Sequence, residues 1–170
     1  MRFLTRAWHA GDLSDEESDA VGAAYRAHRA AVLPSLPPAV RRFAETVDIH
    51  DGLLQRVVLD RPERTLRLDL RCGDLQRGYF DLSLTYRGVR LDSLDAALLT
   101  VIAREPTPEA LHVEEDAFAD GAYVHRWLWW PFRRELDVVF GDLEFRCEPR
   151  ADRRFERVLE PYVEIGAAAV

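Results

Sequence analysis

Acidic and imidazole side chains within residues 110–131 have the types and spacing that acid–base chemistry needs. Asp120-Gly121 is typical of a two-residue hairpin turn, and this turn predicts that Asp116 lies opposite His125. Glu114 is then diagonal to His125 and within reach of its side chain. An imidazole polarised by a carboxylate is the core of a general base or half of a metal site. We therefore take His125, Asp116 and Glu114 as candidate catalytic residues; the alternative is an ion pair on an exposed sheet face.

The same predicted hairpin places two tryptophans on the face of His125. Opposed residues share a face, so Trp127, Trp129 and His112 are expected beside the acidic group. The other face is expected to be apolar, apart from Glu115 opposite Arg126 near its end, and to hold Leu111, Val113, Leu128 and Trp130. Tryptophan is costly to leave in water, which favours a groove, a dimer contact or a covering helix on the outer face. We take Trp127, Trp129 and His112 as candidate binding residues.

His50-Asp51-Gly52 is a second candidate. Hydrolases that bind metal through a His-Asp doublet carry it on a helix, whereas here Gly52 and the strand pattern behind it break any helix. A turn in which Asp51 bonds local amides explains the triplet better, and His50 and Asp51 remain secondary candidates. His112 is about 13 Å along its strand from Asp116, too far to share one zinc ion. We expect no metal and no cofactor.

The composition excludes several classes of chemistry. The net charge is −7 over 170 residues, which disfavours nucleic-acid binding. All 23 basic residues are arginine, so a Schiff-base lysine and a P-loop lysine are both impossible. The N-terminus predicts no signal peptide, and no apolar run reaches membrane-spanning length. Cys72 and Cys147 lie on strand patterns, which favours a reduced, buried pair in the cytoplasm, and a disulfide between them stays open.

The elements begin with helices. Ser14 and Glu17 match a capping box, which predicts a helix that ends at Pro34, and a second helix is expected over Pro38–Val47. Strands are expected over Leu53–Asp60, Thr65–Cys72 and Phe80–Tyr86, with a glycine bulge at Gly88. Ser93–Arg104 fits a helix, and a strand over Leu98–Ile102 fits as well.

The remaining segments complete the expected sheet. Glu135–Cys147 predicts a hairpin that turns at Gly141-Asp142, and Phe155–Tyr162 a short helix. The expected core is Leu68, Leu82, Leu84, Val138, Phe140 and Phe145. We predict an α+β fold in which N-terminal helices pack on one face of a mostly antiparallel sheet of about six to seven strands. Residues 1–170 are expected to form one domain: a helical front (1–48), the sheet with one inserted helix (49–148) and a C-terminal segment (149–170).

Three short segments carry a resemblance to a known group of proteins. They are Arg2–Trp8, His50-Asp51-Gly52 and the run Phe140-Gly141-Asp142-Leu143-Glu144-Phe145. Their order resembles an uncharacterised family of small bacterial proteins with a helical front and an antiparallel meander. Some proteins of this build are immunity proteins against bacterial toxins. The resemblance implies no catalytic residues.

These observations favour a cytoplasmic bacterial protein that is not an enzyme. We expect it to bind another protein or a second copy of itself, and an immunity-type inhibitor is one example of such a protein. Acidic inhibitors suit basic enzymes because complementary charge speeds association. The alternative is a small-molecule-binding protein or small hydrolase that uses His125, Asp116 and Glu114. Neither nucleic acid nor a membrane is an expected partner.

Overall fold

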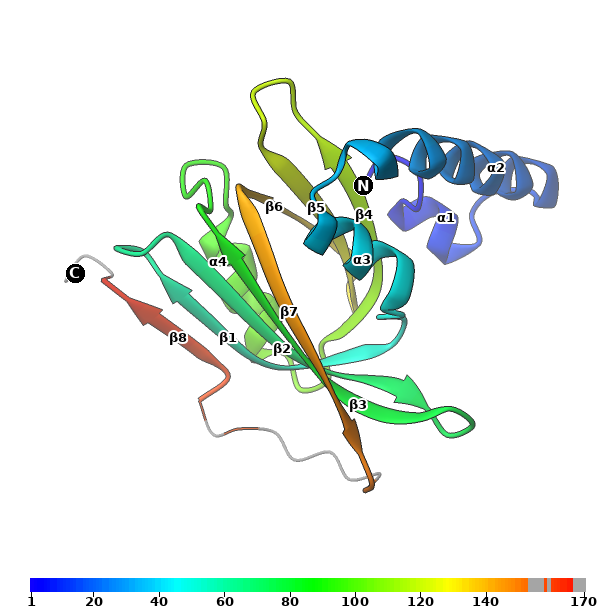
Figure 1. Cartoon of the computed structure of the whole chain (residues 1–170). Coiled ribbons are helices and arrows are strands. Elements are labelled where there is room, and N and C mark those ends of the chain that lie inside the picture. The colour runs from blue at the N-terminus through cyan, green and yellow to red at the C-terminus, as the bar shows by residue number, and fades with distance from the viewer. Residues whose placement is uncertain (153–157, 159, 167–170) are drawn as a thin grey trace.

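The computed structural model describes residues 1–152, 158 and 160–166, and Figure 1 shows the arrangement of their elements. Ser14 and Glu17 form the expected capping box at the start of the longest helix, and Pro38 begins the next. Residues 93–105 contain a helix and no strand, which settles that alternative. The helices are α1 (Arg6–Ala10), α2 (Asp15–Val32), α3 (Pro38–Thr46) and α4 (Ala96–Arg104), with a 3-10 turn at Leu33–Ser35.

The described strands form one sheet in the order β6-β5-β4-β1-β2-β3-β7, and β8 pairs with β1 in parallel. The other pairings are antiparallel and the sheet is not closed, so the α+β fold with N-terminal helices and a mostly antiparallel sheet is confirmed. The strands are β1 (Gly52–Asp60), β2 (Thr65–Asp74), β3 (Gly78–Arg87), β4 (Glu109–Ala117), β5 (Tyr123–Trp130), β6 (Arg134–Phe140), β7 (Asp142–Arg150) and β8 (Tyr162–Ile165).

The predicted hairpin over Glu135–Cys147 is wrong. β6 pairs with β5 and β7 pairs with β3, so the chain passes from one edge of the sheet to the other at Gly141. The sheet is curved, so its two edge strands, β6 and β7, come together at Gly141. There the Gly141 amide donates to the Arg87 carbonyl, and the Arg90 amide donates to the Val139 carbonyl. An alternating pattern of apolar residues predicts which side chains face the core, but it does not predict which strand lies beside which.

The predicted register of the β4–β5 hairpin is wrong by one residue. The connection is a three-residue loop in which the Phe118 amide donates to the Ala122 carbonyl, and Gly121 takes a positive φ of 84°. Such a loop replaces the two-residue turn expected at Asp120-Gly121. The slip makes Glu115, and not Asp116, the partner of His125, and it makes Glu114 the partner of Arg126.

This slip changes what the two faces contain. His125, Trp127 and Trp129 face the core with Val113 and Glu115, and the three side chains are 0–1% exposed. An outer binding face built on Trp127 and Trp129 is therefore wrong, because the core covers these rings. His112, Glu114, Asp116 and Leu128 lie on the opposite face, which the N-terminal residues cover in part. Trp130 is 38% exposed and does not belong to the core.

The core lies between the inner face of the curved sheet and α3, whose Phe43 stacks on His125 at 5.3 Å between ring centres. Leu68, Leu82, Leu84, Val138 and Phe140 are buried as predicted. Phe145 is only half-buried, because it lies on the edge strand β7 with Arg42 of α3 over its ring.

Smaller predictions also need correction. Gly88, with a φ of 62°, follows the last residue of β3 and ends the strand, so it is not a bulge within it. Cys72 is buried and Cys147 is exposed; both thiols are free, and β3 lies between their strands. Residues 155–157 and 159 of the predicted C-terminal helix lie outside the described residues, and its last residue, Tyr162, begins β8. Among the described residues, no helix combines the length and the apolar character needed to cross a membrane.

Candidate functional site

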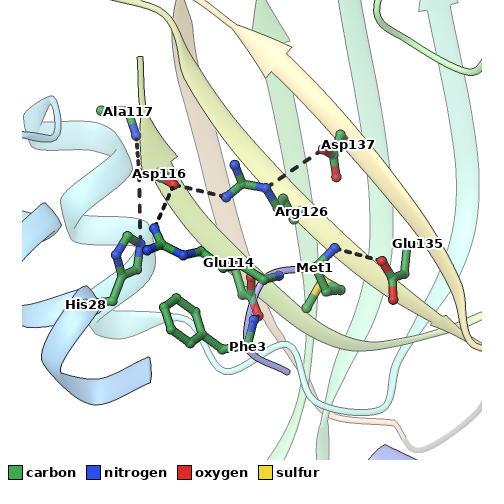
Figure 2. Close-up of polar contacts among 10 residues, drawn as sticks. Met1, Phe3, His28, Glu114, Asp116, Ala117, Arg126, Glu135 and Asp137 are labelled. Atoms are coloured by element: carbon green, nitrogen blue, oxygen red, sulfur yellow. Dashed lines mark hydrogen bonds and ion pairs between the residues drawn. The ribbon is translucent and has the colours of Figure 1, made fainter. Parts of the chain in front are cut away.

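The carboxylate of Glu114 holds the N-terminal segment against the outer face of β4, as Figure 2 shows. The side chain is 1% exposed and accepts backbone hydrogen bonds from the amides of Arg2 (2.7 Å), Phe3 (2.9 Å) and Leu4 (2.6 Å). Hydrogen bonds to an ionised acceptor are about twice as strong as neutral ones. With these three donors bound, Glu114 serves the fold and is not free to act on a substrate.

Asp116 belongs to a charged cluster beside Glu114 (Figure 2). Its carboxylate lies 3.2 Å from an Arg126 nitrogen, 3.9 Å from His28 and 4.0 Å from Arg2. Arg126 also lies 3.8 Å from Asp137 on β6. Asp116 and Glu114 therefore share one face of the hairpin while His125 is on the other, so the structure does not bring the three candidate catalytic residues together.

His125 is fixed inside the core by a chain of hydrogen bonds. Trp127 Nε1 donates to the Tyr86 hydroxyl at 3.1 Å, and that hydroxyl lies 2.9 Å from His125 Nδ1. The Tyr86 hydroxyl thus joins the side chains of Trp127 and His125 within the core. Burial lowers the pKa of His125 to about 3, so this imidazole is neutral near pH 7.

Glu115 lies directly opposite His125 and faces a cavity. The side chain is 4% exposed, and its Oε2 has no hydrogen-bond partner among the described residues. Burial raises the pKa of Glu115 to about 7, although the nearby Arg29 opposes that change. A buried carboxyl oxygen without a partner costs free energy that a bound hydrogen-bond donor would recover. Glu115 is therefore one of several described residues with a buried polar side-chain atom that has no partner, as are His125 and Trp129.

The cavity beside Glu115 has a volume of about 250 Å³ and lies between α2, α3 and β4. β4 pairs with β1 only at Glu109 and Ala110, and α2 packs where β4 leaves β1, with the Tyr25 hydroxyl 3.5 Å from the Val113 carbonyl. Groups of both charges line it. They are Arg26 and Arg29 from α2, Asp48 after α3, and Glu115 from β4, with Tyr25, His50 and His112 as further polar walls.

Three histidines pack together beside this cavity, and two of them, His50 and His112, belong to its lining. The His112 ring centre lies 5.4 Å from that of His50 and 5.7 Å from that of His9, and Trp8 packs on the same ring at 5.4 Å. Burial, together with His50 and His9, lowers the pKa of His112 to about 4, so His112 is neutral near pH 7. The Asp51 carboxylate lies 3.0 Å from His50 Nδ1.

The structure thus brings together residues that were predicted as two separate candidate sites, since His50 and Asp51 lie beside His112. Sequence reasoning missed His9, which reaches the cluster from a five-residue helix, and it placed Glu115 opposite Arg126 on the apolar face. The signal for Glu115 was present in the pattern: an acidic residue occupied a position that the predicted alternation made apolar.

No protein-family model matches this sequence, and no curated protein matches it. Membership of a family of small bacterial proteins stays a prediction.

Proposed function

We propose that this protein binds a small zwitterion, a molecule with both an amine and a carboxylate such as a free amino acid, in the cavity beside Glu115. The observation that carries the proposal is the buried, unpartnered Oε2 of Glu115 beside a cavity that Glu115 lines together with two arginines. Small-molecule sites are concave, and a few polar groups within a mostly apolar lining fix the orientation of the ligand.

Each charged group of the zwitterion has a partner of opposite charge in this cavity. The amine pairs with Glu115, and the carboxylate pairs with Arg26 or Arg29 of α2. Arginine suits this role because its planar group meets a carboxylate with two parallel hydrogen bonds. A cavity of about 250 Å³ suits a metabolite of amino-acid size and is too small for a folded partner.

The elevated pKa of Glu115 predicts the pH dependence of binding. At pH 6 the folded protein holds this carboxyl mostly protonated, and the amine of the ligand must displace that proton. Affinity therefore rises with pH up to about 7 and levels off above it.

This proposal takes up the small-molecule alternative in place of the protein partner. The tryptophan face that favoured a protein partner, and with it an immunity-type inhibitor, is buried in the core. We also propose a cytoplasmic location in a bacterium, which the two free thiols support, since unpaired cysteines are typical of a reducing compartment.

The test is a titration of ¹⁵N-labelled protein with the proteinogenic L-amino acids, followed by amide chemical shifts. We expect at least one amino acid to shift amides of α2 and β4 around the cavity. Glu115→Gln should weaken its affinity at least about 10-fold, because a hydrogen bond to a charged group contributes about 1.5–3 kcal/mol. Glu63→Gln, in the exposed β1–β2 turn, is the matched control and should bind like the wild type.

Modified ligands separate the two charges. The N-acetyl derivative lacks the cation for Glu115, and the methyl ester lacks the anion for the arginines, so each should bind at least about 10-fold more weakly than the parent amino acid. The proposal is wrong if no amino acid shifts the cavity amides, or if the N-acetyl derivative binds as well as its parent.

A further inference from the structure

The strand β7 forms one edge of the sheet, and the second half of this strand is uncovered. Among the described residues it pairs with β3, and it lies at the end of the sheet (Figure 1, orange). Every residue from Arg146 to Arg150 is exposed. An edge strand presents unpaired amides and carbonyls, so another strand can pair with it.

The inner face of β7 loses its cover along the strand. Leu143 is buried and Phe145 is half-buried. Cys147 and Pro149 are exposed, although they lie on the same face as the first two residues. The helix that covers this face, α3, contacts β7 at Phe145, where Arg42 lies over the ring. The inner face of β7 therefore continues beyond its covering helix and leaves room for a partner.

The outer face of β7 carries charges in an alternating order. Every second position is charged, and the run is Glu144, Arg146, Glu148 and Arg150. Two copies of β7 that pair antiparallel about a two-fold axis place residues of the same face opposite each other. The order of the charges then decides which registers attract and which repel.

One register makes every opposed charge in this run complementary. It places the Cys147 residues of the two copies opposite each other at the two-fold axis. Glu144 then lies opposite Arg150, and both such pairs form by symmetry. Arg146 likewise lies opposite Glu148. A register centred on Arg146 or on Glu148 instead opposes that residue to its own copy, and like charges directly opposite are destabilising.

The side chains of this register are accessible to a second strand. Arg146 lies 2.5 Å from Glu148 within one chain, and their side chains are 78% and 53% exposed, so both charges remain within reach of another copy. Pro149 cannot donate a hydrogen bond across the edge, and prolines in sheets are confined mainly to edge strands. In this register Pro149 lies opposite Phe145 of the other copy, and each covers the other on the inner face.

The position of α3 is compatible with the pairing. This helix contacts β7 at Phe145, which lies on the Gly141 side of the axis at Cys147. The Phe145 residues of the two copies are then about 13 Å apart along the strands, at about 3.3 Å per residue. A helix with its side chains is about 10 Å across, so the two α3 helices fit on opposite sides of the axis.

We propose that β7 is the interface for a second copy of this chain, paired antiparallel across its free edge with Cys147 at the two-fold axis. The charges favour this partner, because β7 is complementary to itself in this register. The inference does not depend on the amino-acid site, since no residue of β7 lines that cavity. Each proposal can therefore fail while the other stands.

Sedimentation equilibrium of the full chain at about 0.15 M salt tests the association. We expect a monomer–dimer equilibrium in which dimers form below about 1 mM chain. Arg146→Glu opposes glutamates and Glu148→Arg opposes arginines, so each variant alone should dimerise at least about 10-fold more weakly. An equal mixture of the two variants restores complementary charges between unlike copies and should associate about as strongly as the wild type. Glu63→Arg, in the exposed β1–β2 turn, is the matched control and should dimerise like the wild type.

A short bis-maleimide tests the position of the axis. It should link two wild-type chains through Cys147 and should not link Cys147→Ser, because the remaining Cys72 is buried. A chain that stays monomeric at about 1 mM would overturn the proposal. So would a dimer that the bis-maleimide does not link, or a mixture of the two charge variants that associates no better than either variant alone.

Discussion

Replacing Glu115 by glutamine should change how the free energy of unfolding depends on pH. The wild-type carboxyl has a pKa of about 7 in the fold against 4.5 for an unburied glutamate, so between these values the folded state holds a proton that the unfolded state has lost. Stability from this group is fully present below pH 4.5 and is lost as pH rises through about 7. Glutamine has no proton to lose and removes this dependence.

The size of the effect follows from the difference between the two pKa values. One pKa unit corresponds to about 1.4 kcal/mol, so a difference of about 2.5 units gives a change of about 3 kcal/mol. The free energy of unfolding of Glu115→Gln should therefore rise by about 3 kcal/mol, relative to that of the wild type, as the pH goes from about 4 to about 8.5. Because the pKa of His125 is lowered, this residue makes the fold less stable as the pH falls. The effect is present in both proteins and therefore cancels when their free energies of unfolding are compared.

Urea unfolding followed by tryptophan fluorescence measures this difference, because Trp127 and Trp129 are buried and lose their surroundings when the chain unfolds. Steps of about half a pH unit define the curve. Glu63→Gln, in an exposed turn, should track the wild type throughout. A difference that stays constant within about 0.5 kcal/mol across the range, or that falls with pH, would refute the account of Glu115 as a buried carboxyl without a partner.

Three other predictions follow from the same geometry. Glu114→Ala should cost at least about 2 kcal/mol and should speed hydrogen exchange at the amides of Arg2, Phe3 and Leu4, whereas an unchanged exchange rate would show that this carboxylate does not hold the segment. Trp127→Ala should cost about 3–5 kcal/mol in urea unfolding, and a loss below about 1 kcal/mol would contradict its place in the core. Exposed Cys147 should react with a thiol reagent in the folded protein while Cys72, whose pKa burial raises to about 12, reacts only after unfolding; equal rates in the folded protein would contradict this.

Local sequence patterns predicted the helices and strands better than they predicted which of these elements lie side by side. The Ser14–Glu17 capping box marks the start of α2, because both hydrogen bonds lie within one turn of the chain. The β6–β7 crossing could not be predicted, since it depends on how far the whole sheet curls before Gly141. One extra loop residue between β4 and β5 was enough to replace Asp116 by Glu115 as the partner of His125.

The candidate site was predictable only in pieces. His50, Asp51 and His112 stood out by residue type, but their meeting depends on the pairing of Gly52 with Ala110, which joins β1 to β4. His9 gave no signal, because a helix as short as α1 has too few residues for a periodic pattern.

The proposed site at Glu115 can be tested by titrating the Glu115 carboxyl itself. Its side-chain carboxyl carbon, labelled with ¹³C and assigned by comparison with Glu115→Gln, reports its protonation as pH changes. We predict a pKa of about 7 in the free protein. With the best-binding amino acid at saturation, that pKa should fall toward the ordinary glutamate value, because the bound amine favours the ionised form. A Glu115 that titrates at the ordinary value, or whose pKa no amino acid changes, would contradict the proposed binding site.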